Sequence, residues 1–116
     1  MAVTFEMVRR MALSLDKVEE GTSYGTPAFR VAGNLFLRLH QDMESLVVGM
    51  DFEDRAGLLA DDPETYYITD HYLNYKWVLV RMARIHPDAL RDLLRMAWRS
   101  AARSPRRATR RRGRCK

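Results

Sequence analysis

The chain has 116 residues, of which 47% are hydrophobic, and this size and composition are typical of one globular domain with its own core. Charged residues interrupt the N-terminal segment, and no stretch approaches the ~20 apolar residues of a membrane span, so we expect neither a signal peptide nor a membrane protein. The single cysteine, Cys115, excludes an internal disulfide and a cysteine-only zinc site. The expected location is the cytoplasm.

The positive charge of the chain is concentrated at its C-terminus. Residues 103–116 hold eight of the 20 Lys and Arg residues and no acid, so residues 1–102 carry 12 basic and 15 acidic groups, a net charge of −3. Proline, glycine and charge repulsion predict that the tail is disordered when free. We therefore expect one folded domain, 1–102, and a basic tail, 103–116. The tail is either an arm for nucleic acid or another polyanion, or a solubilising segment without a partner.

The first half of the chain predicts one helix and three strands. Apolar residues at helical spacing indicate a helix that begins after the N-cap Thr4 and ends at Leu15. A glycine-rich loop is expected next, and then strands at 27–32, 35–40 and 45–50, the first two joined by a hairpin turn at Gly33-Asn34.

The second half predicts two further strands between two helices. A short helix is expected from Phe52, ended by Asp61-Asp62-Pro63, and a long one from Pro87 to about Ala102. Between them, residues 66–69 and 76–85 are rich in β-branched and aromatic residues, which favours strands. The order α-β-β-β-α-β-β-α predicts an α+β fold with an antiparallel five-stranded sheet backed by helices.

The segment Gly21-Thr22-Ser23-Tyr24-Gly25 matches the G-x-S-x-G pattern of a hydrolase nucleophile elbow. That elbow requires a strand before the serine and a helix after it. Here the expected helix precedes Ser23 and a strand follows it, so we interpret the segment as a structural loop in which Gly25 permits a positive φ. No other catalytic constellation is present, and a non-enzymatic protein is expected.

Four motifs occur in order along the chain: Gly-Thr-Ser-Tyr-Gly-Thr-Pro-Ala-Phe from Gly21, Asp62-Pro63-Glu64, Thr69-Asp70-His71-Tyr72 and Trp77-Val78-Leu79-Val80-Arg81. In their order and spacing they resemble the MmcQ/YjbR family over roughly residues 5–100. The resemblance implies a small single-domain protein with a fold similar to secretion chaperones and to double-wing DNA-binding domains. It also implies DNA binding, the function with which the family is commonly labelled, and it supplies no catalytic residues. The basic tail lies outside the resemblance.

Alternation along the strands predicts which side chains share each face of the sheet. The face covered by helices should hold Val31, Leu35, Leu37, Leu39, Leu46, Val48, Val78, Val80 and Met82. The opposite face should hold Arg30, Phe36, Arg38, His40, Val47, Trp77, Leu79 and Arg81. Arginines interleaved with aromatic residues suit phosphates and stacked bases. The candidate DNA-binding residues are therefore Arg30, Arg38, Trp77 and Arg81, together with the tail residues Arg106, Arg107, Arg110, Arg111 and Arg112.

Alternatives to DNA binding remain open. Phe36, Val47, Trp77 and Leu79 could instead form a second small core or a dimer contact, with the arginines as a solvated rim. A stable dimer that buries an apolar patch around Phe36, Val47 and Leu79 would favour a protein-interaction or chaperone-like adaptor. The net charge of −3 also argues against tight DNA binding by the folded domain alone. Tyr24, His71 and Tyr72 form a candidate pocket for a small molecule. The three histidines lack the spacing of metal ligands, and we expect no metal or cofactor.

Overall fold

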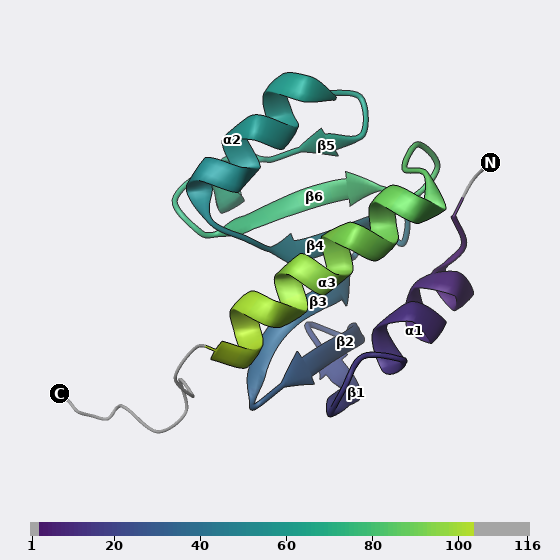
Figure 1. Cartoon of the computed structure of the whole chain (residues 1–116). Coiled ribbons are helices and arrows are strands. Elements are labelled where there is room, and N and C mark those ends of the chain that lie inside the picture. Colours follow the sequence, from purple (N-terminus) through teal and green to yellow (C-terminus); the bar gives the residue numbers. More distant parts are fainter. Residues whose placement is uncertain (1–2, 104–116) are drawn as a thin grey trace, which may run out of the picture.

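The computed structural model describes residues 3–103, which form an antiparallel sheet with two helices on one face (Figure 1). The strands lie in the order β1-β2-β3-β4-β6-β5. In chain order the elements are α1 (Phe5–Leu13), β1 (Val18–Ser23), β2 (Thr26–Val31), β3 (Asn34–Leu39), β4 (Ser45–Gly49), α2 (Phe52–Asp61), β5 (Tyr66–Tyr67), the 3-10 helix η1 (Asp70–Tyr72), β6 (Trp77–Arg81) and α3 (Pro87–Arg103).

The main core lies between the sheet and the helices α1 and α3. Helix α3 crosses the front of the strands in Figure 1, and α1 lies beside it. The buried residues of α3 recur at helical spacing and pack against β2, β3 and β4: Leu90, Leu93, Leu94, Ala97 and Ala101. The α+β class with an antiparallel sheet is therefore confirmed. Within residues 3–103, no helix is long and apolar enough to cross a membrane.

The sheet has six strands, so the expectation of five is wrong. The predicted glycine-rich loop is in fact β1, an edge strand that pairs with β2 from Val18↔Val31 to Ser23↔Thr26. Tyr24 and Gly25, with φ values of 54° and 81°, join the two strands, and two positive φ values in succession are typical of a tight hairpin. Most of β1 is exposed, so it carries none of the hydrophobic alternation by which a strand is recognised.

The register of β3 corrects the predicted faces at two positions. Phe29 pairs with Leu37, but Arg30 pairs with Leu35, so Phe36 is the extra residue of a β-bulge. The bulge shifts the alternation by one residue. Phe36, which was assigned to the open face, is 1% exposed in the main core, and Leu35 is not part of that core.

Other boundaries differ by a few residues. The hairpin between β2 and β3 turns at Ala32 and Gly33, one residue earlier than predicted, because Asn34 already pairs with Val31 as the first residue of β3. Strand β5 has only two residues, and β6 ends at Arg81, well before the predicted residue 85.

Candidate nucleic-acid interface

All six strands contribute to the sheet face opposite α1 and α3. Successive register pairs connect one row of residues from β1 to β5: Gly21, Ala28, Arg38, Val47, Leu79 and Tyr67. Val47 and Leu79 are buried with Tyr72, and Tyr67 and Trp77 pack around them. The centre of this face is therefore a second small core, as the alternative interpretation predicted for Val47, Trp77 and Leu79, whereas Phe36 belongs to the main core. Because Phe36, Val47 and Leu79 are at most 1% exposed, the expectation of an apolar patch around them is wrong.

Arg38 lies next to this second core, because it pairs with Val47 across the sheet, and it is only 4% exposed. Its Nη2 donates to the Tyr72 hydroxyl at 2.7 Å, and its Nη1 lies 3.2 Å from the Leu39 carbonyl oxygen and 3.3 Å from the Gln41 side-chain oxygen. The segment that carries Tyr72 closes over the guanidinium, which the alternation of β3 does not reveal. Arg38 is therefore a buried structural cation and is not placed to meet a phosphate.

The other three predicted residues of the sheet face have different surroundings. Arg81 is exposed, but its Nη1 donates to the Glu64 carbonyl oxygen at 3.0 Å and its guanidinium lies 4.0 Å from the centre of the Tyr67 ring. Arg30 and Trp77 are half-buried and line a cleft that neither Arg38 nor Arg81 touches. The four residues therefore do not form one binding surface.

Tyr24, His71 and Tyr72, the predicted pocket residues, lie around Arg38. The Arg38 guanidinium lies 5.1 Å from the centre of the Tyr24 ring and is hydrogen-bonded to Tyr72. The His71 ring meets the Tyr72 ring edge-on at 4.8 Å. None of the three lines the cleft. Tyr24 and Tyr72 are joined by the Arg38 guanidinium, and His71 is joined to them through the Tyr72 ring.

Arg55, a residue that the sequence analysis did not single out, organises the segment between η1 and β6. It is 7% exposed and is the buried residue of α2. The carbonyl oxygens of Tyr72, Tyr75 and Trp77 lie 3.0, 2.7 and 3.1 Å from its Nη1, and that of Leu73 lies 3.0 Å from its Nη2. This one guanidinium therefore holds the backbone of residues 72–77.

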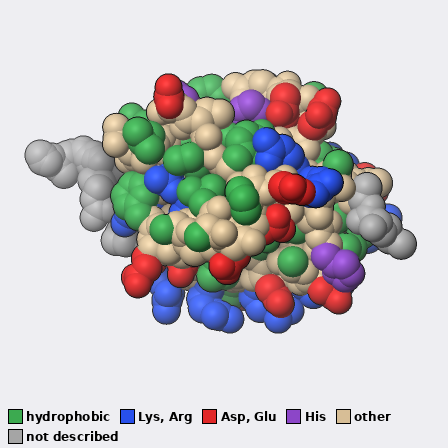
Figure 2. All heavy atoms as spheres, turned by 90° about the horizontal axis from the view of Figure 1, so that it is seen from above, with side chains coloured by type: hydrophobic (Ala, Val, Ile, Leu, Met, Phe, Trp, Pro, Cys, Tyr) green, Lys and Arg blue, Asp and Glu red, His purple; other side chains and the backbone are tan. Residues whose placement is uncertain are grey.

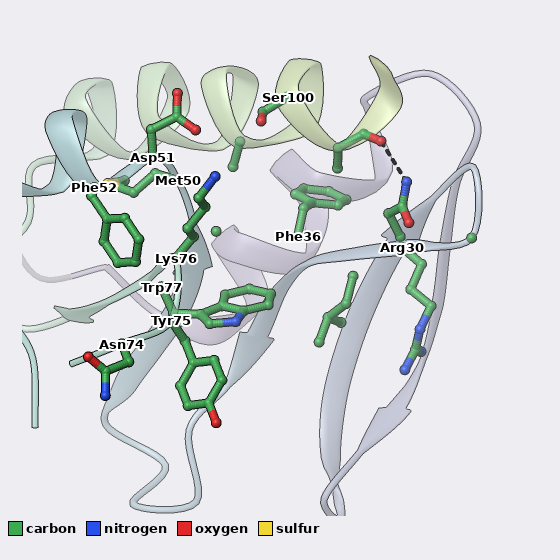
Figure 3. A pocket seen from close by; sticks show the side chains of 16 residues that line it. Arg30, Phe36, Met50, Asp51, Phe52, Asn74, Tyr75, Lys76, Trp77 and Ser100 are labelled. Atoms are coloured by element: carbon green, nitrogen blue, oxygen red, sulfur yellow. Dashed lines mark hydrogen bonds between the residues drawn. The ribbon is translucent and has the colours of Figure 1, made fainter. Parts of the chain in front are cut away.

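The cleft lies where β3 parts from β4. Pairing between these strands runs from Leu39↔Leu46 to Leu37↔Val48 and stops at the bulge, while Gly49 continues to pair with Trp77 of β6. The gap has a volume of about 560 Å³ and reaches the last turns of α3. Its side chains include four aromatic rings and three charged groups (Figure 3): Phe36, Phe52, Tyr75, Trp77, Arg30, Lys76 and Asp51.

The outer side of α3 carries a row of exposed arginines. Arg91, Arg95, Arg99 and Arg103 recur every four residues, opposite the buried stripe of the helix. Arg91 is paired with Asp88 at 3.1 Å, whereas Arg95, Arg99 and Arg103 form no ion pair within residues 3–103. We call these last three the α3 ridge. Figure 2 views the molecule from above, so its lower edge is the front of Figure 1, where α3 lies. Lys and Arg side chains gather along this lower edge.

The α3 ridge leads directly into the basic segment of the sequence. The five predicted tail residues, Arg106 to Arg112, lie outside the described residues. Sequence analysis counted Arg103 with the tail but assigned no role to Arg95 or Arg99, although their four-residue spacing on a predicted helix was a usable signal.

Comparisons with known proteins support the predicted resemblance. A stretch of 55 residues is 38% identical to "Uncharacterized protein Mb2600" of Mycobacterium bovis and to "Uncharacterized protein Rv2570" of Mycobacterium tuberculosis, and it covers 45% of this chain but only 43% of each relative. The crystal structure of Deinococcus radiodurans protein DR2400, a DUF419 domain, is similar in fold, with a TM-score of 0.75 and 22% identity over 89% of this chain and 81% of that one. The YjbR family model matches residues 13–100. The chain belongs to the YjbR family.

Proposed function

We propose that this protein is a non-enzymatic DNA-binding protein that contacts the DNA backbone through the α3 ridge and the basic segment after it. The observation that carries the proposal is that Arg95, Arg99 and Arg103 are exposed, one helical turn apart, and without a carboxylate partner in the part of the chain that is described. Like charges at this spacing disfavour a helix by roughly 0.2–0.5 kcal/mol per pair. A polyanion would remove that repulsion.

The position of the ridge reconciles the charge of the domain with DNA binding. Residues 1–102 carry a net charge of −3, but their cations are unevenly distributed. The last three turns of α3 present Arg95, Arg99 and Arg103, and seven more basic residues follow in 104–116 without an acid. Phosphate contacts of this kind supply sequence-independent affinity and strong salt dependence.

The test is the salt dependence of binding to a labelled duplex, measured by fluorescence anisotropy on the full chain. Each neutralised phosphate contributes a slope of about −0.9 in log affinity against log salt. The variant Arg95→Gln/Arg99→Gln/Arg103→Gln should therefore reduce the magnitude of the slope by about 2.7, three contacts at ~0.9 each. An unchanged slope would show that α3 does not meet the DNA.

A matched control removes the same charge elsewhere. Lys17, Arg81 and Arg84 are exposed and lie outside α3. The variant Lys17→Gln/Arg81→Gln/Arg84→Gln should change the slope by less than one phosphate contact, ~0.9. A third variant measures how much the tail contributes to duplex affinity and to its salt dependence. It carries glutamine in place of Arg106, Arg107, Arg110, Arg111 and Arg112. If only this tail variant loses affinity, the folded domain is not part of the interface.

A second candidate function, a protein-interaction adaptor, is favoured by an exposed apolar patch. Phe52, Leu73 and Tyr75 are 42%, 54% and 59% exposed. Arg55 connects them, because its guanidinium carbon lies 4.8 Å from the centre of the Phe52 ring and its nitrogen atoms bind the carbonyl oxygens of Leu73 and Tyr75. Sedimentation velocity tests whether this patch forms a homodimer, which Leu73→Asp should dissociate. If the protein is a monomer at all concentrations, the patch does not bind a second copy of this chain, and the homodimer version of the adaptor hypothesis is wrong.

A further inference from the structure

We propose that the cleft between β3 and β4 binds an aromatic base that carries a phosphate, as a free mononucleotide or as an unpaired nucleotide of a single strand. This inference goes beyond the proposed function, because a ligand in the cleft needs neither the α3 ridge nor the tail. The cleft, at about 560 Å³, is within the size range of small-molecule sites. Residues of both sheet faces line the cleft, because it lies where β3 separates from β4.

The aromatic lining indicates a flat ligand. Trp77 packs so closely over Gly49 that a Cβ there would lie 3.3 Å from the indole ring. Glycine thus lets the indole lie against the backbone of β4. Figure 3 shows the indole within the cleft, with Phe36 toward α3 and Tyr75 on the other side. Tyr75 is 59% exposed, so a large part of its ring is available to a stacked base.

The charged lining indicates an anion. Arg30 and Lys76 line the cleft, and neither forms an ion pair within residues 3–103. Asp51 lines it too, at the opposite end from Arg30 in Figure 3, and its carboxylate makes no capping hydrogen bond to α2. Lys76 lies on the Asp51 side of the cleft in Figure 3, so Arg30 alone marks the end at which a phosphate is expected. Asp51 is available to accept from the amino or imino groups of a base.

The backbone of this site is held by Arg55. Tyr75, Lys76 and Trp77 all belong to the segment whose carbonyl oxygens the Arg55 guanidinium binds. The site is therefore supported by a buried contact and not by a free loop, which lowers the entropic cost of ordering it around a ligand.

The experiment uses the fluorescence of Trp77 in the full chain. The sequence has two tryptophans, so Trp98→Phe leaves Trp77 as the only one. In this background, short oligothymidylate and adenosine monophosphate are titrated separately, with inorganic phosphate as the control for cation binding alone. We expect saturable quenching by at least one of the two nucleotide probes and none by phosphate. Quenching by the mononucleotide identifies a free nucleotide as a sufficient ligand, and quenching by the oligonucleotide alone identifies a single strand.

Variants separate this inference from the proposed function. Tyr75→Ala should weaken nucleotide binding by about 5- to 150-fold, the effect of losing a stacked base. Tyr24→Ala removes a more exposed tyrosine, 77% exposed and outside the cleft, and should have no effect. Neither variant should change duplex affinity. Absence of Trp77 quenching by both nucleotide probes, or equal loss in the two tyrosine variants, would overturn the inference even if the α3 ridge binds duplex as proposed.

Discussion

Replacement of Arg55 by methionine should destabilise the protein by about 3 kcal/mol. Four backbone carbonyl oxygens lie within 3.1 Å of the Arg55 guanidinium, which is 7% exposed. A hydrogen bond to a charged group contributes roughly 1.5–3 kcal/mol. The four bonds share two nitrogen atoms, three carbonyls are only partly buried, and methionine keeps some of the packing, so the total is far below four times that value.

Urea unfolding followed by tryptophan fluorescence measures this loss, with the midpoint and slope fitted separately. For a domain of this size, ~3 kcal/mol should lower Tm by about 12–24 °C. Amide hydrogen exchange in residues 72–77 should rise before global unfolding, because the segment loses its central contact. A variant within about 0.5 kcal/mol of the parent would refute the reasoning.

Arg84→Met is the matched control for this prediction. Arg84 also carries a guanidinium with an acceptor, the Glu64 carboxylate, but both side chains are mostly exposed. Surface pairs of this kind contribute about 0–1 kcal/mol. Comparable losses in the two variants would mean that the burial of Arg55 is not what makes it important.

Three further predictions concern the hairpin, the β3–α3 contact and acid stability. Gly25→Ala forces a side chain into φ = 81° and should cost about 1–2 kcal/mol in urea unfolding; a neutral result would show that the turn relaxes freely. Asn34→Ala removes the bond from its Nδ2 to the Ala101 carbonyl oxygen at 2.9 Å and should lower stability by about 1–2 kcal/mol in a thermal melt, whereas an unchanged melt would mean that water replaces it. Burial of Asp42 raises its pKa, but two backbone N–H donors and nearby His40 outweigh burial, and the pKa is lowered from 3.8. The contribution of Asp42 to the stability of the fold is therefore fully present above its ordinary pKa of 3.8, and it is lost as the pH falls through the lowered pKa of the folded state. The stability difference between the parent and Asp42→Asn should shrink in the same range, and a difference independent of pH would contradict this assignment.

Most of the fold was predictable because its central elements are largely buried and therefore carry strong apolar patterns. Strands β2, β4 and β6 show period-two patterns or continuous apolar runs, and the stripe on α3 has the period of a helix. Strand β1 was missed because an exposed edge strand buries neither face. The bulge at Phe36 was missed because it appears only in the pairing of β3 with β2.

The candidate sites were less predictable because their residues depend on contacts distant in sequence. The alternation of β3 places Arg38 on the open face, yet Tyr72, 34 residues later, closes over it. Arg55 binds carbonyls 17 to 22 residues away, and backbone acceptors leave no trace in the sequence. The cleft likewise exists because two strands part, which no local pattern indicates.

The most direct test of the proposed interface is NMR mapping of the full chain during titration with a duplex. Resonances of the Arg95 and Arg99 side chains and of the outer α3 amides should shift together with those of the tail. The side chain of Arg38, which is buried, should not respond. Shifts confined to residues after Arg103, or located on the open sheet face around Arg81, would contradict the account and assign the binding surface elsewhere.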